Sequence, residues 1–245
     1  MLDAFFTNST VVVTGAAGTV GRELVKQLLT LPVREVRALD NDESALFFLE
    51  QEHRSDTRLQ VFLCDIREFS QLHEMFKGME YVFHAAALKH VPLCERSPSE
   101  AIRTNILGVE NVIRAATSTG VARVLFTSSD KAVNPTNVMG TSKLMGERLI
   151  TSANALSTKT TTPIFSSTRF GNVAGSAGSV IPLFCHQIAS GEAVTLTDKK
   201  MTRFLMTLND SVKLVLTSMV LARGGEVFVT KMPVVRIKEL AHVLI

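Results

Sequence analysis

Short apolar runs rich in Val, Ile and Leu alternate along the chain with longer stretches of helical periodicity. The runs that predict strands are 10–14, 35–39, 59–64, 81–84, 123–127 and 226–230. The stretches that predict helices are 19–30, 44–52, 100–118, 138–155 and 180–188. Strands that alternate with helices indicate a parallel sheet with helices on both faces. The strands are apolar throughout, which is typical of a sheet that is covered on both sides.

A glycine-rich segment, Thr14-Gly15-Ala16-Ala17-Gly18-Thr19-Val20-Gly21, joins the first predicted strand to the first predicted helix. The three glycines would allow a tight turn, a close approach of the backbone to a pyrophosphate, and close packing of the helix on the sheet. The helix N-terminus adds free N–H groups and a positive dipole end. We therefore predict cofactor contacts at Gly15, Ala17, Gly18, Thr19, Val20 and Gly21. The alternative is an ordinary turn with incidental glycines.

Acidic residues end the second and third predicted strands. Asp40 lies about 20 residues beyond the glycine turn, where a carboxylate would accept hydrogen bonds from the adenosine ribose. Its charge would repel a 2′-phosphate, and Asn41 rather than Arg follows it, so we expect NAD, with NADP still possible. Asp40 could also cap the helix that follows. Asp65, which precedes Ile66, could contact the adenine edge or cap a helix beginning near Glu68, and both alternatives stay open.

Composition narrows the class of protein. The chain has 245 residues, of which 46% are hydrophobic and 20% charged, as in an ordinary globular protein. Its net charge of +3 comes without a long basic run, so we expect no nucleic-acid partner. Three dispersed cysteines suggest neither disulfides nor a metal site and fit a reducing compartment, so we expect a cytoplasmic protein. No secretory signal and no run long enough to span a bilayer is visible.

Further segments carry a family resemblance, namely 84–92 (HAAALKHVP), 104–111 (TNILGVEN), 127–132 (TSSDKA), 139–143 (MGTSK), 169–173 (RFGNV) and 201–204 (MTRF). Together with the glycine turn they resemble the extended short-chain dehydrogenases/reductases. More narrowly, they are similar to bacterial UDP-N-acetylglucosamine 4,6-dehydratases of the CapD-like polysaccharide biosynthesis family. The resemblance runs from about Ser9 to Leu240, and the segments 129–132 and 201–204 are its most specific parts.

The resemblance implies an internal redox elimination that gives a UDP-4-keto-6-deoxy sugar. Hydride would leave sugar C4 for the nicotinamide, water would be lost across C5 and C6, and hydride would return to C6. By resemblance, Asp130 is the acid at O6, Lys131 is the base at C5, and Ser129 hydrogen-bonds O4. A lysine can act as a base only where burial or neighbouring charge lowers its proton affinity. The alternative is a solvated loop with an Asp-Lys pair.

One position departs from the family pattern. The usual catalytic Tyr-x-x-x-Lys is Met139-x-x-x-Lys143 in this chain. A subgroup of these dehydratases carries Met here, so the change does not by itself imply an inactive enzyme. It does remove the group that normally takes the sugar hydroxyl proton. Lys143, one helical turn away on the same face, would hold the nicotinamide ribose. The alternative for Met139 is a side chain that fills the core.

Other residues complete the predicted site. Further cofactor contacts are expected at Asn41, Asp65, Ile66, Ala85, Ala86, Ala87 and Asn105. Lys89 and His90 would lie near the sugar, although a lone histidine is usually structural. Asn172 and Arg203 are candidate diphosphate ligands, because the planar donor fork of arginine suits phosphate. The alternative for Arg203 is a surface salt bridge.

These features predict an α/β fold of the Rossmann type, a doubly wound parallel sheet with a smaller, incomplete C-terminal substrate-binding region. We expect residues 1–170, completed by 207–230, to form the NAD(P)-binding domain. Residues 171–206 and 231–245 would form part of the substrate-binding domain, with a loop at 171–179. The family's segment beyond Ile245 is missing, so we expect this chain to bind cofactor but to turn over poorly.

The partners predicted are a UDP-sugar and a second copy of the chain. The predicted helix 100–118 is apolar around much of its circumference, so one of its faces could pack on the sheet and another on a partner chain. Two other functions stay open. One is a UDP-sugar C4 epimerase, and the other is a dinucleotide-binding regulatory module without turnover, which Met139 favours and the Asp130-Lys131 pair opposes.

Overall fold

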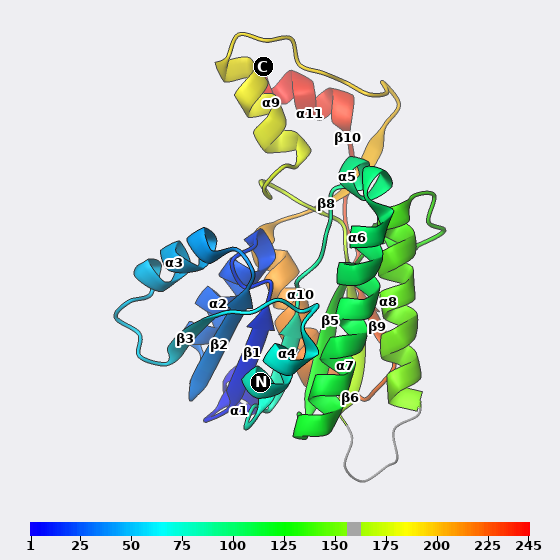
Figure 1. Cartoon of the computed structure of the whole chain (residues 1–245). Coiled ribbons are helices and arrows are strands. Elements are labelled where there is room, and N and C mark those ends of the chain that lie inside the picture. Colours follow the sequence, from blue (N-terminus) through cyan, green and yellow to red (C-terminus); the bar gives the residue numbers. More distant parts are fainter. Residues whose placement is uncertain (156–162) are drawn as a thin grey trace.

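The computed structural model describes residues 1–155 and 163–245. Its main body is a seven-stranded sheet in the order β3-β2-β1-β4-β5-β6-β9 (Figure 1). Every neighbouring pair in this sheet is parallel. The strands are β1 (Thr10–Thr14), β2 (Glu35–Asp40), β3 (Leu59–Leu63), β4 (Tyr81–His84), β5 (Arg123–Ser129), β6 (Ile164–Phe170) and β9 (Val227–Val229). The predicted doubly wound parallel sheet is confirmed.

Helices cover both faces of this sheet. They are α1 (Leu2–Phe6), α2 (Thr19–Thr30), α3 (Glu43–Glu52), α4 (Phe69–Phe76), α5 (Val91–Arg96), α6 (Pro98–Ile102), α7 (Gly108–Thr119), α8 (Val138–Ala155) and α10 (Leu208–Leu221). Helices α2 and α10 pack together, as do α4, α7 and α8. Val11 and Val13 of β1 belong to one hydrophobic cluster and Val12 to a second, so the alternate side chains of one buried strand supply two cores.

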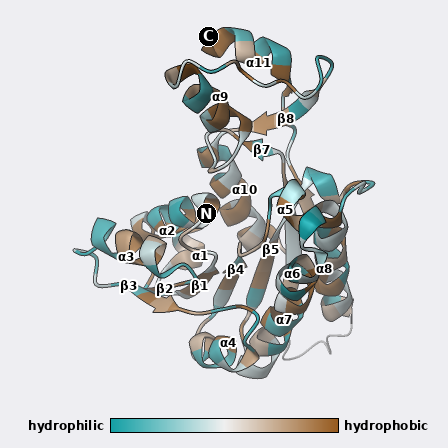
Figure 2. Cartoon of the chain, turned by 45° about the horizontal axis from the view of Figure 1, so that its top comes forward, coloured by the Kyte–Doolittle hydropathy of each residue, from teal (hydrophilic) through white to brown (hydrophobic). Residues whose placement is uncertain are grey.

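A second, smaller lobe follows the carboxyl end of β6. It contains a three-stranded sheet in the order β10-β8-β7, formed by β7 (Asn172–Val173), β8 (Thr202–Met206) and β10 (Val234–Arg236). Figure 2 shows this sheet between α10 and the helices α9 (Val180–Ala189) and α11 (Ile237–Leu244). Phe184, Ile237 and Ala241 form the buried contact between those two helices. The division of the chain into two domains remains a prediction.

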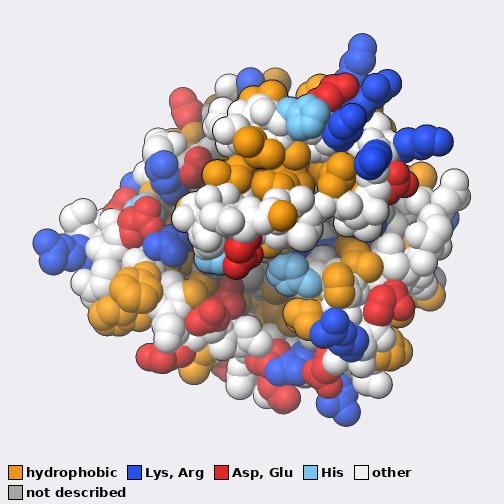
Figure 3. Space-filling view, turned by 90° about the horizontal axis from the view of Figure 1, so that it is seen from above, with side chains coloured by type: hydrophobic (Ala, Val, Ile, Leu, Met, Phe, Trp, Pro, Cys, Tyr) orange, Lys and Arg blue, Asp and Glu red, His pale blue; other side chains and the backbone are white. Residues whose placement is uncertain are grey.

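Hydrophobic side chains gather on the outer surface of this lobe, which faces the viewer in Figure 3. The large hydrophobic residues of this lobe that are exposed are Leu183, Phe204, Val234, Val243 and Ile245. Within the residues that the structure describes, no helix combines the length and the hydrophobicity needed to cross a membrane.

The predicted helix 100–118 is observed as one uninterrupted helical stretch, 98–119, but its hydrogen-bond type changes along its length. Helix α6 ends at Ile102, a π-helix occupies Arg103–Leu107, and α7 begins at Gly108. A Cβ on Gly108 would lie 2.8 Å from the terminal methyl of the Ile66 side chain, so the helix packs closely against Ile66 here and a larger residue would displace that methyl group. One extra residue in a turn rotates the residues that follow it by about 100° around the helix axis, so the apolar side chains before and after the π-helix face different sides. A pattern read at 3.6 residues per turn shows such a stretch only as apolar around much of its circumference.

The structure also differs from the predictions at β6 and β7. Strand β6 was not predicted, because Ser166, Ser167 and Thr168 interrupt its apolar pattern although all three are buried. The segment 171–179 is not entirely a loop, because its residues Asn172–Val173 pair with β8. The other predicted strands and helices have bounds within two residues of those observed, the usual scatter at element ends.

Candidate functional site

The predicted site residues come together at one edge of the sheet. The carboxyl ends of parallel strands lie side by side, and ligands of such sheets bind there. The glycine turn follows β1, Asp40 ends β2, Ala85 follows β4, Ser129 ends β5 and Asn172 follows β6. Residues from five strands, distant in sequence, therefore share this edge.

The glycine turn is tightly packed at its two ends, Gly15 and Gly21, and has free space at its middle, Gly18. Gly15 has a φ of +69°, and a Cβ there would lie 2.5 Å from the Ala86 backbone nitrogen. A Cβ on Gly21 would lie 2.0 Å from the Gly15 carbonyl oxygen. At Gly18, in contrast, a Cβ would meet only that oxygen, at 3.3 Å. Gly18 is also the N-cap of α2 and supplies no side-chain acceptor to its first turn. These N–H groups at a bare helix end fit a pyrophosphate.

Asp40 ties this turn to the end of β2. Its carboxylate accepts hydrogen bonds from the Ala17 nitrogen at 3.0 Å and from the Asn41 and Asp42 nitrogens at 2.8 and 3.2 Å. The alternative in which Asp40 caps the next helix is wrong. Asp42 is the N-cap of α3, where it accepts from the Ala45 nitrogen at 3.0 Å. The Asn41 side chain is exposed.

Asp65 also stabilises its own turn. Its carboxylate accepts from the backbone nitrogen of Arg67 at 2.9 Å and pairs with the guanidinium of that residue. These hydrogen bonds hold the pKa of Asp65 below its usual range. Glu68 is the N-cap of α4, so the capping alternative for Asp65 is wrong, while adenine contact stays a prediction. Ile66 is buried, with 5% of its surface exposed.

Ser129, Asp130, Lys131 and Asn172 form one hydrogen-bonded group. Lys131 Nζ lies 3.0 Å from Asp130 Oδ1 and 3.0 Å from Asn172 Oδ1. Ser129 Oγ donates to the same Asp130 oxygen at 2.9 Å. A short 3₁₀ turn, Asp130–Ala132, follows β5 and places these side chains together. A Cβ on Gly140 would lie 2.3 Å from the Lys131 carbonyl oxygen, so α8 packs directly against this turn.

Lys143 is buried beside this group. Its Nζ donates to the Thr127 carbonyl oxygen at 2.9 Å and lies 4.8 Å from the centre of the Phe126 ring. Burial lowers the pKa of Lys143 to about 8. Met139 is 3% exposed and packs with Cys94 and Ala101, as expected of a side chain that fills the core. Its catalytic role stays a prediction.

Asn105 lies in the π-helix and is 1% exposed. Its Oδ1 accepts from the Leu88 nitrogen at 2.8 Å, and its Nδ2 donates to the Leu88 oxygen and to Ser142 Oγ, both at 2.9 Å. The amide thus fixes the segment after Ala87 to α8. The predicted contact of Asn105 with the cofactor would have to be made in addition to these bonds.

The loop before α9 bridges two parts of the site. Ala177 donates its N–H to Thr19 Oγ1 at 3.2 Å and accepts at its oxygen from Lys89 Nζ at 2.8 Å. A Cβ on Gly178 would lie 2.4 Å from the His90 ring. The loop therefore lies between the glycine turn and residues 89–90, and burial lowers the pKa of Lys89.

Arg203 lies on β8 and donates to the Thr202 carbonyl oxygen at 2.8 Å. Among the described residues it forms no ion pair, so the predicted alternative of a surface salt bridge is not observed. Nor does a hydrogen bond between described residues connect it to the group around Asp130. Its role as a diphosphate ligand stays a prediction.

Sequence reasoning missed three polar residues on the α8 side of the sheet, of which His84 and Glu147 are buried and Arg169 is partly exposed. His84 is fully buried, with Nδ1 2.7 Å from Thr14 Oγ1, and burial lowers its pKa to about 3. Glu147 of α8 and Arg169 of β6 form a bidentate ion pair, with Nε–Oε1 and Nη2–Oε2 distances of 2.8 and 2.7 Å. The four-residue spacing of Glu147 from Lys143 was the available signal.

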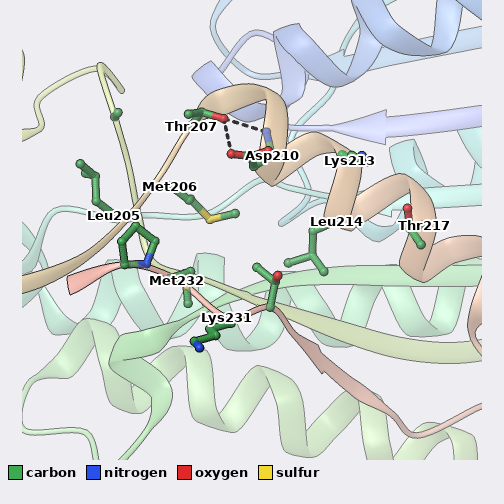
Figure 4. A pocket seen from close by; sticks show the side chains of 12 residues that line it. Leu205, Met206, Thr207, Asp210, Lys213, Leu214, Thr217, Lys231 and Met232 are labelled. Carbon is green, nitrogen blue, oxygen red and sulfur yellow. Dashed lines mark hydrogen bonds between the residues drawn. The ribbon is translucent and has the colours of Figure 1, made fainter. Parts of the chain in front are cut away.

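The structure also contains a cavity of about 580 Å³ (Figure 4). Its lining comes from β8, α10 and the link between β9 and β10, and includes Leu205, Asp210, Lys213 and Met232. None of the predicted site residues lines this cavity. It therefore lies apart from the group around Asp130.

Comparisons with known proteins agree with this geometry. A family model described as a polysaccharide biosynthesis protein matches residues 11–245. The chain is 49% identical over 241 residues to an uncharacterized membrane protein of Methanocaldococcus jannaschii, covering 98% of this chain and 72% of that protein. It is 42% identical over 246 residues to a UDP-glucose 4-epimerase of Rickettsia bellii, covering 98% and 71%.

Solved structures agree too. The crystal structure of Pen from Bacillus thuringiensis superposes with a TM-score of 0.95 at 43% identity, covering 98% of this chain and 76% of that one. A dTDP-glucose 4,6-dehydratase of Streptomyces venezuelae, DesIV, with NAD and TYD bound, gives a TM-score of 0.89 at 24% identity, covering 96% and 80%. At that identity the likeness shows a shared fold.

Proposed function

Because the chain belongs to the polysaccharide biosynthesis protein family of extended short-chain dehydrogenases/reductases, we propose that it is a nucleotide-sugar 4,6-dehydratase. The substrate proposed is UDP-N-acetylglucosamine, and the product is a UDP-4-keto-6-deoxy sugar. Modification of a nucleotide sugar agrees with the name of the epimerase relative and with the family description. The finer assignment to dehydration depends on the group around Asp130.

NAD is the cofactor of this proposal. The open middle of the glycine turn at Gly18 and the bare N-terminus of α2 would hold its pyrophosphate. Asp40, at the end of β2, would accept hydrogen bonds from the adenosine ribose and repel a 2′-phosphate. Lys143 would hold the second ribose. When bound, the nicotinamide exchanges hydride with the sugar.

The contact between Lys131 Nζ and Asp130 Oδ1, at 3.0 Å, carries the assignment to dehydration. Loss of water across C5 and C6 needs a base at C5 and an acid at O6 in the same site. Transfer of one proton from Lys131 to Asp130 converts the ion pair into an amine and a carboxylic acid. The amine then takes the C5 proton and the acid gives its proton to the departing hydroxyl, so the elimination restores the ion pair.

Asn172 and Ser129 form hydrogen bonds with the Lys131 and Asp130 side chains. Asn172 Oδ1 accepts from Lys131 Nζ at 3.0 Å and so fixes the direction of the amine. Ser129 Oγ, which lies 2.9 Å from Asp130 Oδ1, would hydrogen-bond sugar O4. Since Met139 lacks a phenolic hydroxyl, Ser129 carries more of the proton transfer at O4. The buried Lys143 contributes its charge beside this position.

Mass analysis of the nucleotide sugar tests the proposal. Incubation with UDP-N-acetylglucosamine and NAD should give a product that has lost one water. Asp130→Asn and Lys131→Ala should each slow water loss by roughly 10²–10⁴-fold, the usual worth of one positioned proton donor or acceptor. Both variants should still bind NAD, because the glycine turn follows a different strand.

A matched control exists in the exposed ion pair of Glu74 and Lys77 at the end of α4. Glu74→Gln and Lys77→Ala make the same kinds of change far from the site and should leave water loss unaltered. Unchanged water loss in Asp130→Asn and Lys131→Ala would remove the proposed roles.

A C4 epimerase is the second candidate, because the chain is 42% identical to a relative named UDP-glucose 4-epimerase. An epimerase needs no proton transfer at C5 or O6. Its product would keep the mass of the substrate. Because an epimerase loses no water, Asp130→Asn would then have little effect on the steps that follow oxidation at C4. The same mass measurement therefore separates the two functions.

A further inference from the structure

The ion pair of Glu147 and Arg169 lies beneath the site, between α8 and β6. The Glu147 side chain is 4% exposed and that of Arg169 is 25% exposed. Two parallel hydrogen bonds of 2.8 and 2.7 Å join them. Burying the Glu147 carboxylate costs free energy that a geometry of this quality only partly recovers, and the partly exposed Arg169 loses part of its hydration as well. Folding alone does not explain why two charges rather than two apolar side chains occupy this place.

Lys143 precedes Glu147 by one turn of α8, so the two side chains share a face of the helix. The charge of Glu147 favours the ammonium form of Lys143, whereas burial opposes it and lowers the pKa to about 8. Other groups face the same amine. Cys94 of α5 and His84 of β4 are its titratable neighbours, and β5 contributes the Thr127 carbonyl oxygen and the Phe126 ring.

We propose that Glu147 and Arg169 are positioning residues that set the charge state of Lys143. The carboxylate stabilises the ammonium, and the guanidinium, through its bidentate contact, limits that stabilisation. Lys143 is thereby held close to the balance between its two charge states at neutral to mildly alkaline pH. This inference rests on the proposed function in one respect, since that function makes Lys143 the group that holds the cofactor ribose.

Opposite substitutions should have opposite effects. In Arg169→Gln, Glu147 loses its partner, and its carboxylate stabilises the ammonium form of Lys143 more strongly. Lys143 should therefore release its proton at higher pH. In Glu147→Gln, the stabilising carboxylate is gone and an unpaired guanidinium remains, so the proton should leave at lower pH. If the pair were purely structural, the pH midpoint of the Lys143 titration would not move in opposite directions in the two variants.

The experiment is a pH titration of the chain labelled with ¹³C at lysine Cε, followed by NMR, with Lys143→Met to assign the signal. We expect the midpoint of Lys143 to rise in Arg169→Gln and to fall in Glu147→Gln. Each change should be about one pH unit, the order expected when one neighbouring charge is gained or lost. The pH at which NAD affinity declines should move in the same directions.

The exposed pair of Arg236, at the end of β10, and Glu239, on α11, supplies the control, because Arg236→Gln and Glu239→Gln change the same residue types far from Lys143. If a single variant of the buried pair fails to fold, the double variant Glu147→Gln, Arg169→Gln leaves no unpaired charge. Its midpoint should lie between those of the wild type and Glu147→Gln.

Midpoints that stay fixed, or that move in the same direction in both single variants, overturn the inference. An unchanged midpoint in the double variant does so too. If the midpoints move as expected but the pH dependence of NAD affinity does not change with them, the effect of Glu147 and Arg169 on the charge state of Lys143 is still confirmed. In that case the role that the proposed function gives Lys143 is wrong.

Discussion

Asp40 shows what one residue can reveal before and after the structure is known. Its place at the end of a strand, after a glycine turn, was sufficient to predict a polar contact at that edge. The choice between Asp40 and Asp42 as the helix cap was not predictable, because both are acceptable caps two residues apart. The three-dimensional path of the turn decides it, since Ala17 brings its N–H to Asp40 and Ala45 brings its own to Asp42.

Cofactor selectivity follows from the charge of Asp40. We expect Asp40→Asn to raise the affinity for NADP relative to NAD by about tenfold, or about 1.4 kcal/mol, because it removes the charge that opposes a 2′-phosphate. Titration of both cofactors measures this. Asp42→Asn removes a charge two residues away, at the α3 cap, and should leave the ratio unchanged. Tighter binding of NADP than of NAD by the wild type would contradict the prediction.

The chemistry of other residues depends on contacts that no sequence pattern contains. The adjacency of Asp130 and Lys131 is visible in the sequence, but the contact of Lys131 with Asn172 joins residues 41 positions apart. Similarly, Arg169 meets Glu147 from a strand that was not predicted. Such pairs are set by the order of strands in the sheet, so they become visible only when β5 and β6 are known to be neighbours.

At the scale of elements, apolar runs predicted the buried strands and the helices between them. Strand β1 and the helix after it were predicted with their observed bounds, because Val11–Val13 are fully buried and glycines mark the turn. Strand β6 was missed because Ser166, Ser167 and Thr168 interrupt its apolar pattern although all three are buried. The polar residues of β6 lie next to the buried part of the site, so the failure of the pattern there coincides with the chemistry.

The glycine turn makes a prediction that separates packing from binding. Gly21→Ala would place a Cβ 2.0 Å from the Gly15 oxygen, so we expect the free energy of unfolding to fall by about 1–3 kcal/mol. Gly18→Ala meets that oxygen at 3.3 Å and should fold almost normally. Its new methyl group would occupy the open middle of the turn and lower NAD affinity by about tenfold or more.

Urea unfolding and NAD titration of the two variants check both parts. The variants serve as controls for each other, because each makes the same substitution in the same turn. Equal stability of Gly21→Ala and Gly18→Ala would contradict the packing argument. Unchanged NAD affinity in a folded Gly18→Ala would show that the cofactor does not approach this turn.

At the scale of the whole molecule, two lobes meet along the carboxyl edge of the main sheet. The larger lobe supplies the glycine turn and the group around Asp130, and the smaller lobe begins with Asn172, which contacts that group directly. The loop at Ala177 adds a second connection, to Thr19 and Lys89. Movement of the small lobe relative to the sheet would therefore act on Lys131, the proposed base, and on the glycine turn together.

Self-association is the prediction that belongs to this scale. Helices α5 to α8 contact one another and leave Leu93, Ile102, Leu107 and Met145 between 46% and 58% exposed. Large apolar side chains gathered on adjacent helices indicate a surface that a second copy would cover. We expect a dimer at micromolar concentration in analytical sedimentation, and we expect Leu107→Glu to weaken it by roughly tenfold to a hundredfold. Phe48→Glu, on the exposed side of α3, should leave it intact, and a wild type that sediments as a monomer would defeat the prediction.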